Sequence, residues 1–223
     1  MTPMLRYDHD VSQKLVSFDG RQKHIAEAFD ALYERLMLAD LNRKRVFSFF
    51  KKWVGVNSNL RGIYLWGGVG RGKTYLMDLF YECLPFSEKQ RIHFHRFMLS
   101  IHEELECLQG VRNPLDRIAV RIAEKTKVLC VDEFFVLDIG DAMLLSGLLE
   151  GLFKRGVVFV ATSNAHPDSL YKDGLQRDSF LPAIKLIKKY TDVIELSGAL
   201  DYRLRSLTKA VLYHSPHNQD TEQ

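Results

Sequence analysis

The sequence has few cysteines, no long apolar run and little excess charge, and each absence excludes a class of protein. Its three cysteines lie far apart without a Cys-x-x-Cys pair, which excludes a disulfide framework or a cysteine-based metal site. No apolar stretch has the length of a membrane span. The first residues lack the apolar core of a secretory signal and the acid-poor composition of a transit peptide. The cytosol is therefore the expected location.

Length and composition predict a soluble globular protein. Of the 223 residues, 46% are hydrophobic and 26% are charged, which is enough apolar material for a buried core. The formal net charge of +3 permits an acidic partner without arguing for one, and there is no dense basic run of the kind that binds nucleic acid. We expect a helical segment over residues 1–60 packed on an α/β core over 61–207, then a polar tail over 208–223.

Short apolar runs alternate with segments of helical periodicity from residue 61 onward. The central runs are apolar at every position, without the inside/outside alternation of a half-exposed strand. They therefore predict an α/β fold with a parallel sheet covered by helices on both faces. The predicted strands are Ile63–Trp66, Arg91–Phe94, Val128–Val131, Val157–Ala161 and Val193–Leu196.

The remaining segments carry weaker predictions. Residues 1–20 are polar and predict an irregular chain, and helical spacing predicts one helix from Gln22 and a separate one over Arg43–Trp53. Asn113 and Asp138 each precede a helical pattern and are expected to cap it.

The most informative segment is Gly67–Thr74, GGVGRGKT, which matches the phosphate-loop pattern Gly-x-x-x-x-Gly-Lys-Ser/Thr. A predicted strand precedes it and a predicted helix follows, so backbone N–H groups and a helix amino terminus would face a bound phosphate. Lys73 is expected to reach the β- and γ-phosphates of a nucleotide, and the Thr74 hydroxyl to bind Mg²⁺. The predicted nucleotide-binding residues are Gly67, Gly68, Val69, Gly70, Arg71, Gly72, Lys73, Thr74 and Tyr75.

An acidic pair, Asp132-Glu133, follows a buried predicted strand. The carboxyl ends of parallel strands face the ligand crevice of such sheets. We expect Asp132 to hold Mg²⁺, usually through water, and Glu133 to polarise a water for attack on the γ-phosphate. Acidic residues also end many strands for structural reasons alone, but the phosphate loop upstream favours a catalytic pair. A base beside the γ-phosphate suits a hydrolase better than a nucleotide kinase.

Two further residues are candidates for the reaction. If the strand before Asn164 lies beside Ile63–Trp66, the Asn164 amide can hydrogen-bond the γ-phosphate and the attacking water; the alternative is an asparagine in a turn. Arg177 could enter a neighbouring subunit's site and neutralise charge on the transferred phosphoryl group, and a surface arginine is an equally good interpretation.

The segment Phe94-His95-Arg96-Phe97 mixes aromatic and basic residues. We interpret Phe94 and Phe97 as strand residues packed in the core, and contact with a protein or single-stranded nucleic acid through His95 or Arg96 as the lesser alternative. The histidines nearby have no spacing typical of metal ligands.

Together these motifs resemble the AAA+ ATPases, and more narrowly their ZapE/AFG-one-like family. The resemblance runs through LWGGVGRGKTYLMDLFY, RIHFHRFMLSIHEEL, VLCVDEFFVLDIGDAMLL, VATSNAHPDSLYKDGLQRDSFLPAI and DYRLRSL, from about the first helix to Leu207. The HFHRFM and GLQR-x-x-FLPAI segments are far more specific than a phosphate loop.

The resemblance implies more than the residues themselves do. It implies strand order 5-1-4-3-2, ATP as the nucleotide, a nucleotide-dependent ring of subunits and Arg177 as an arginine finger. It also implies ATP hydrolysis coupled to protein remodelling: on the division protein FtsZ in the bacterial branch, with recruitment to the division site, and on membrane-protein subunits in the mitochondrial branch. The expected lack of a transit peptide favours the bacterial branch.

Members of this family continue into a carboxyl-terminal region with a helical lid and a second sensor arginine. Near the end of this chain only Arg203 and Arg205 are available, and we assign them no role. Two alternatives to a remodelling ATPase therefore remain: a nucleotide-gated binding module with little turnover, and an ATPase related to nucleic-acid loaders.

Overall fold

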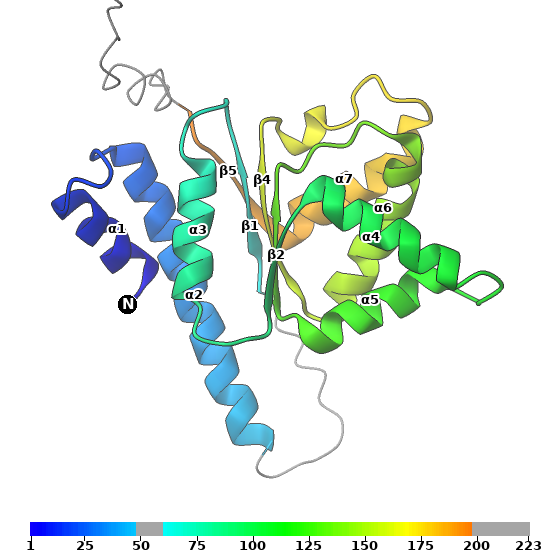
Figure 1. The fold of residues 1–223 in the computed structure, drawn as a ribbon, viewed down its shortest axis with the longest axis horizontal. Coiled ribbons are helices and arrows are strands. Elements are labelled where there is room, and N and C mark those ends of the chain that lie inside the picture. Colours follow the sequence, from blue (N-terminus) through cyan, green and yellow to red (C-terminus); the bar gives the residue numbers. More distant parts are fainter. Residues whose placement is uncertain (48–59, 198–223) are drawn as a thin grey trace, which may run out of the picture.

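A parallel five-stranded sheet lies between two layers of helices in this computed structural model, which describes residues 1–47 and 60–197 (Figure 1). The strand order is β2-β3-β4-β1-β5. This confirms the predicted order 5-1-4-3-2, read from the opposite edge of the sheet. The strands are β1 (Gly62–Trp66), β2 (Lys89–His93), β3 (Val128–Asp132), β4 (Val158–Ser163) and β5 (Thr191–Glu195).

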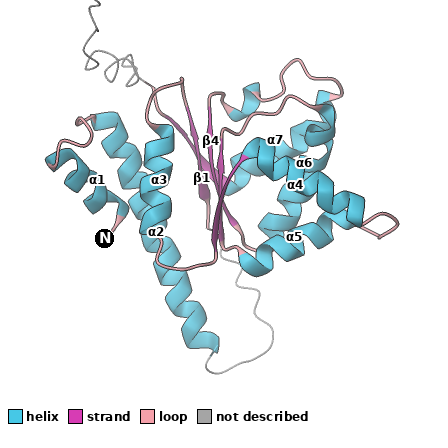
Figure 2. Cartoon of the chain, viewed as in Figure 1, coloured by secondary structure: helices cyan, strands magenta, loops and turns pink. Residues whose placement is uncertain are grey.

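Helices cover both faces of the sheet, with α1–α3 on one side and α4–α7 on the other (Figure 2). Within the described ranges, no helix combines the length and the apolar character needed to cross a membrane. The helices are α1 (Pro3–Ser12), α2 (Gly20–Phe47), α3 (Lys73–Cys83), α4 (Phe94–Cys107), α5 (Pro114–Lys125), α6 (Ile139–Lys154) and α7 (Arg177–Tyr190), with a short 3₁₀ helix at Pro167–Ser169.

The central strands contribute side chains to two separate cores. On β3, Val128 and Cys130 pack with the α1–α3 layer, whereas Leu129 and Val131 pack with the α4–α7 layer. This two-sided burial explains why the predicted strands are apolar at every position. Burial raises the pKa of the Cys130 thiol to about 12, so this cysteine is a protonated core residue, as its apolar surroundings in the sequence predict.

The prediction of an irregular chain over residues 1–20 is wrong, because Pro3–Ser12 forms helix α1. Pro3 stands in the first helical turn, where its missing N–H costs nothing. Tyr7 is fully buried, and its hydroxyl donates to the Asp19 carbonyl at 3.0 Å. Tyr7 is the one buried aromatic residue of α1, and a single such residue does not produce the periodic pattern that would predict a helix from the sequence.

Several predicted boundaries also differ from the structure. Phe94 is the first residue of helix α4 rather than the end of a strand, so the alternating-strand interpretation of Phe94 and Phe97 is wrong although both are buried. The helical spacing of Phe97, Ile101 and Leu105 in the sequence is confirmed, since all three lie in α4. Arg43 lies within α2, because no glycine or proline interrupts the helix before it. Residues 48–53 of the predicted second helix lie outside the described ranges.

The ends of helices and strands depart from the predictions in smaller ways. Asn113 occupies the cap position of α5 in a left-handed conformation, but its side chain makes no cap hydrogen bond. Asp138 does cap α6, accepting from the Gly140 N–H at 2.6 Å. Strand β4 runs on to Ser163, so Asn164 follows it directly. Leu196 lies just beyond β5, and its N–H still donates to the Trp66 carbonyl.

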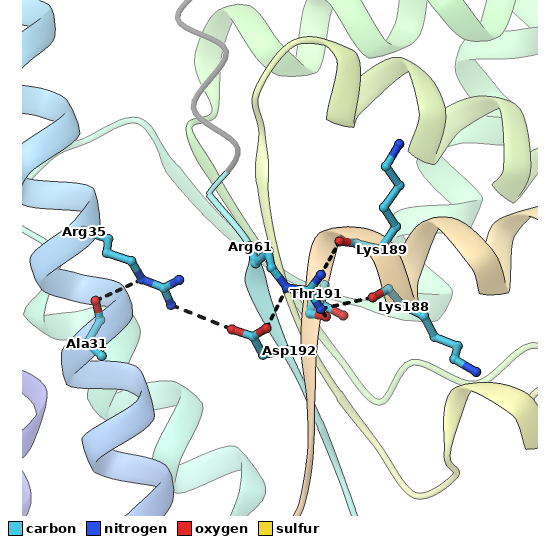
Figure 3. Close-up of polar contacts among 7 residues, drawn as sticks. All are labelled: Ala31, Arg35, Arg61, Lys188, Lys189, Thr191 and Asp192. Carbon is cyan, nitrogen blue, oxygen red and sulfur yellow. Dashed lines mark hydrogen bonds and ion pairs between the residues drawn. The ribbon is translucent and has the colours of Figure 1, made fainter.

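One arginine, Arg61, joins the ends of three elements (Figure 3). It directly precedes β1, at the end of that strand opposite the phosphate loop. The Arg61 guanidinium donates to the carbonyls of Lys188 and Lys189, which are unpaired acceptors in the last turn of α7, and to the carbonyl of Thr191 at the start of β5. It also pairs with Asp192 at 2.6 Å, on strand β5. Arg61 thus fastens the carboxyl end of α7 and the start of β5 to the start of β1.

Replacing Arg61 with alanine is expected to lower the free energy of unfolding by about 1–3 kcal/mol, because several charged hydrogen bonds to carbonyls are lost. The midpoint of thermal unfolding should fall by about 2–4 °C for each kcal/mol in a chain of this size. Arg35→Ala is the matched control, since Arg35 reaches the same Asp192 only at 3.9 Å from an exposed position. Equal effects of the two substitutions in a thermal melt would contradict the role given to Arg61.

Candidate nucleotide-binding site

The loop Gly67–Gly72 joins β1 to α3 at the carboxyl edge of the sheet, and its shape requires glycine at two positions. Gly72 has a φ of +89°, and a Cβ there would lie 2.6 Å from the Gln22 amide nitrogen. Gly67 has a φ of +151°, and a Cβ there would lie 2.4 Å from the Leu196 carbonyl oxygen. Helix α3 begins at Lys73, so its unpaired N–H groups face the mouth of this loop.

Lys73 is buried and lies at the centre of the loop. Its Nζ donates to the carbonyls of Gly67 and Gly68, each at 2.7 Å, and to the Asn164 side-chain oxygen at 2.9 Å. The contact with Asn164 exists because β4, which ends just before it, pairs directly with β1. The condition for Asn164 to reach the γ-phosphate, that its strand lie beside the phosphate-loop strand, is therefore met.

The acidic pair lies at the same edge of the sheet. Asp132 is only 2% exposed, and its two carboxylate oxygens accept from Arg91 Nε at 2.6 Å and from the Thr162 hydroxyl at 3.2 Å. Glu133 is exposed and has a left-handed φ of +53°, and its N–H donates to the Thr162 hydroxyl at 3.1 Å. Thr162 on β4 thus contacts both acidic residues and holds them at the end of β3.

A cavity of about 410 Å³ joins these groups. It brings together Lys73, Thr74, Glu133 and Asn164, four residues from three separate segments of the sequence. Asp132 does not line the cavity, but it lies buried next to Thr162, and Thr162 does line the cavity. The lining residues are Val69, Gly70, Arg71, Gly72, Lys73, Thr74, Glu133, Thr162, Ser163 and Asn164.

The cavity suits a polyanion. Arg71 Nη1 is buried and has no hydrogen-bond partner among the described residues, and the Arg71 side chain passes within 3.5 Å of where a Cβ on Gly68 would lie. A buried guanidinium N–H without a partner is costly unless an acceptor reaches it. Together with Lys73 and the start of α3, Arg71 gives one wall of the cavity a surplus of donors, which fits phosphate oxygens.

The site also has a donor set that fits Mg²⁺. The Thr74 hydroxyl lies on the cavity wall, and both oxygens of Asp132 are already hydrogen-bonded, an arrangement suited to holding a metal ion through water. Across residues 1–47 and 60–197, no three His, Cys, Asp or Glu side chains gather as a metal cage. Mg²⁺ would therefore need phosphate oxygens to complete its shell, as is common for this ion.

Five of the predicted site residues do not line the cavity: Gly67, Gly68, Tyr75, Asp132 and Arg177. Arg177 is the first residue of α7, and its Nη2 donates to the Asp168 carbonyl at 2.6 Å. Its buried Nε has no hydrogen-bond partner in the described part of the chain. The Tyr75 hydroxyl donates to Asp10 on α1 at 2.9 Å, and burial followed by this bond raises the pKa of Tyr75. Tyr75 therefore contributes its side chain to the junction with α1.

Two residues in contact with the site were not predicted from the sequence. Gln22 on α2 is 3% exposed, and its amide donates to the Arg71 carbonyl in the loop at 3.0 Å. Arg91 on β2 binds Asp132. Neither belongs to the phosphate loop or the acidic pair. Arg91 begins the RIHFHRFMLSIHEEL segment of the resemblance, but only the folded chain shows that it contacts Asp132.

Comparisons with known proteins give the family. The family model described as AFG1-like ATPase matches residues 1–223. The chain is 47% identical to "Cell division protein ZapE" of Escherichia coli over 229 aligned residues, which cover 99% of this chain and 61% of that protein. It is 44% identical to "Lactation elevated protein 1 homolog B" of Danio rerio over 73% of this chain and 35% of that protein. The chain thus spans less than two thirds of the length of these relatives.

Among solved structures, that of DnaI superposes with a TM-score of 0.54 over 82% of this chain and 88% of that one. At 14% identity this similarity concerns the fold alone, and it agrees with the P-loop AAA+ architecture of the sheet and its phosphate loop. The family match over the whole chain and the high identity to the bacterial relative carry the assignment. The chain belongs to the AFG1-like ATPase family.

Proposed function

We propose that this protein hydrolyses ATP with Mg²⁺ and uses the reaction to remodel a protein partner in cell division. The single observation that carries the proposal is the cavity in which Lys73, Thr74, Glu133 and Asn164 face one another across the sheet edge. A phosphate-binding loop alone would suit a kinase equally well, but an exposed carboxylate across the cavity suits the activation of water.

In this scheme each residue has one task. The loop amides, the start of α3 and Lys73 bind the phosphates, and Lys73 exchanges its bonds to the loop carbonyls for bonds to phosphate oxygens. Glu133 accepts a proton from the attacking water, and Asn164 orients that water against the γ-phosphate. Thr74 and Asp132 would hold Mg²⁺, which neutralises charge on the phosphates when bound.

Arg177 is proposed to act on the nucleotide of an adjacent subunit in a nucleotide-dependent ring. It does not line the cavity of its own chain. Its guanidinium is held at the start of α7 by one bond to the Asp168 carbonyl, while the buried Nε lacks a partner in the described residues. A second copy that places its triphosphate against this guanidinium would gain a positive charge close to the transferred phosphoryl group.

The protein partner is proposed from the family. The Escherichia coli relative is named a cell division protein, and the tubulin-like FtsZ is the client that the resemblance implies. Recruitment to the division site would follow from such an interaction. Stimulation of ATP turnover by polymerised FtsZ, but not by bovine serum albumin, would support this partner.

The direct test of the function is phosphate release from ATP with and without Mg²⁺, together with the mass of the protein in solution under the same conditions. We expect ATP hydrolysis that requires Mg²⁺, at a rate per subunit that rises with protein concentration as subunits associate. Nucleotide binding without turnover at high protein concentration would instead favour a nucleotide-gated binding module.

The role of Arg177 can be tested by mixing two inactive variants. Arg177→Ala lacks the finger but keeps Glu133, and Glu133→Gln lacks the base but keeps the finger. Mixed rings would contain interfaces with both groups, so the mixture is expected to release phosphate several-fold faster than the sum of the separate variants. Pairing Arg177→Ala with the double variant Glu133→Gln/Arg177→Ala is the control and should restore nothing. If the mixture releases phosphate only as fast as the two variants do separately in sum, Arg177 does not act on the site of a neighbouring subunit.

A further inference from the structure

The carboxylate of Asp132 is connected to helix α3 through one arginine. Arg91 on β2 donates through Nε to Asp132 at 2.6 Å, and its Nη1 forms an ion pair with Asp78 on α3. Asp78 lies one helical turn after Thr74. Asp132, Arg91 and Asp78 therefore form a chain of contacts from the end of β3 to the helix that carries the phosphate-binding residues.

Strand register explains why Arg91 reaches both carboxylates. Arg91 pairs with Cys130, two residues before Asp132 on the adjacent strand β3. Since side chains two residues apart on a strand share a face, the side chains of Cys130 and Asp132 both face the α3 layer. The Arg91 side chain runs along that same face and fills the gap between strand and helix.

The partners of Asp132 leave its carboxylate little freedom. One oxygen accepts from Arg91 and the other accepts from the Thr162 hydroxyl, and the side chain is 3% exposed. A guanidinium carries its N–H groups in a rigid planar fork, so two simultaneous carboxylate contacts fix its orientation. The direction of the Asp132 oxygens is thus set relative to Thr74 rather than relative to β3 alone.

We propose that Arg91 is a positioning residue for the metal site, which holds Asp132 at the correct place relative to Thr74 by bridging it to Asp78. This inference rests on the proposed function, because it takes Thr74 and Asp132 as the groups that would hold Mg²⁺. Arg91 does not line the cavity, so it acts through Asp132. Residues that orient metal ligands typically change metal affinity by about 10- to 100-fold when replaced.

The test measures the dissociation constant of a non-hydrolysable ATP analogue in EDTA and in excess Mg²⁺. The first constant divided by the second gives the strengthening of binding by Mg²⁺, and this ratio is compared between the wild type and each variant. Arg91→Lys keeps the charge but loses the fork. We expect it to reduce the strengthening of binding by Mg²⁺ about tenfold, while binding in EDTA stays within about twofold of wild type. Asp78→Asn, at a half-exposed position, should reduce the ratio in the same direction and serves if Arg91→Lys does not fold.

The matched control is Arg155→Lys. Arg155 is 26% exposed in its side chain, close to the 23% of Arg91, and it pairs with Asp116 on the far side of the sheet. This substitution should leave the ratio unchanged. A purely stabilising ion pair at Arg91 would lower the melting temperature without changing the ratio, and that result would overturn the proposal. Equal weakening of binding with and without Mg²⁺ would overturn it too.

Failure of the proposed function has a different signature. If the wild-type protein binds no analogue in either condition, then the nucleotide site itself is wrong and the role of Arg91 falls with it. If the wild type binds and responds to Mg²⁺ but Arg91→Lys and Asp78→Asn both behave like it, only the role of Arg91 is wrong.

Discussion

Replacing Glu133 with glutamine is expected to lower the rate of ATP turnover by about 10²–10⁴-fold, the usual contribution of a general base. The substitution keeps the size and shape of the side chain but removes its ability to take a proton from water. Because Glu133 contacts the rest of the site through its backbone N–H, at 3.1 Å from the Thr162 hydroxyl, the fold of the strand end should persist. Nucleotide binding should remain within a few-fold of wild type.

The measurement is phosphate release under single-turnover conditions, with the dissociation constant for ATP determined in parallel. Glu124→Gln is the control, since Glu124 is exposed on α5, which packs on the opposite face of the sheet. Turnover that is equal in wild type and Glu133→Gln would exclude Glu133 as the base. Loss of binding together with turnover would mean that Glu133 supports the site structurally.

Lys73→Ala should have the largest effect on nucleotide binding. Charged hydrogen bonds contribute about 1.5–3 kcal/mol each, so loss of contacts to two phosphates is expected to raise the dissociation constant for ATP about a hundredfold or more. The loop should also loosen, because Lys73 Nζ joins the carbonyls of Gly67 and Gly68 to Asn164. Both effects act in the same direction and are independent of the metal.

Binding in excess Mg²⁺ and in EDTA distinguishes this variant from a metal-site variant. Lys73→Ala should weaken binding in both conditions, whereas Arg91→Lys should weaken it only with Mg²⁺. Lys154→Ala is the control, since Lys154 is 64% exposed and pairs with Glu150 within its own helix. An ATP affinity in Lys73→Ala equal to that of wild type would refute the phosphate-binding role of the loop.

Most of the candidate site was predictable because its parts occupy fixed places in local sequence patterns. Four glycines and a lysine between a predicted strand and a predicted helix indicate the phosphate loop. Asp132 ends the buried strand β3, and Glu133 and Asn164 directly follow β3 and β4; parallel strands bring their carboxyl ends to one edge. Predicting that these residues lie close together therefore needed only the strand order, which the family resemblance implied.

The errors lie where a segment has little periodic signal of its own. Helix α1 packs on α2 through the buried Tyr7, and α4 begins at Phe94, before the helical spacing that starts at Phe97 in the sequence. Arg203 and Arg205, to which no role was assigned, lie outside the described residues. Local propensity is a weak guide where tertiary contacts decide the conformation.

The strands, the phosphate loop and the acidic pair were predictable from local sequence, because glycine conformations, apolar runs and strand ends are properties of neighbouring residues. The residues that support them became visible only in the folded chain. Gln22 reaches the loop from α2, and Arg91 ties Asp132 to Asp78 across two strands and a helix. Such contacts join residues from separate segments of the chain, and their geometry depends on strand register and helix packing, which no local pattern encodes.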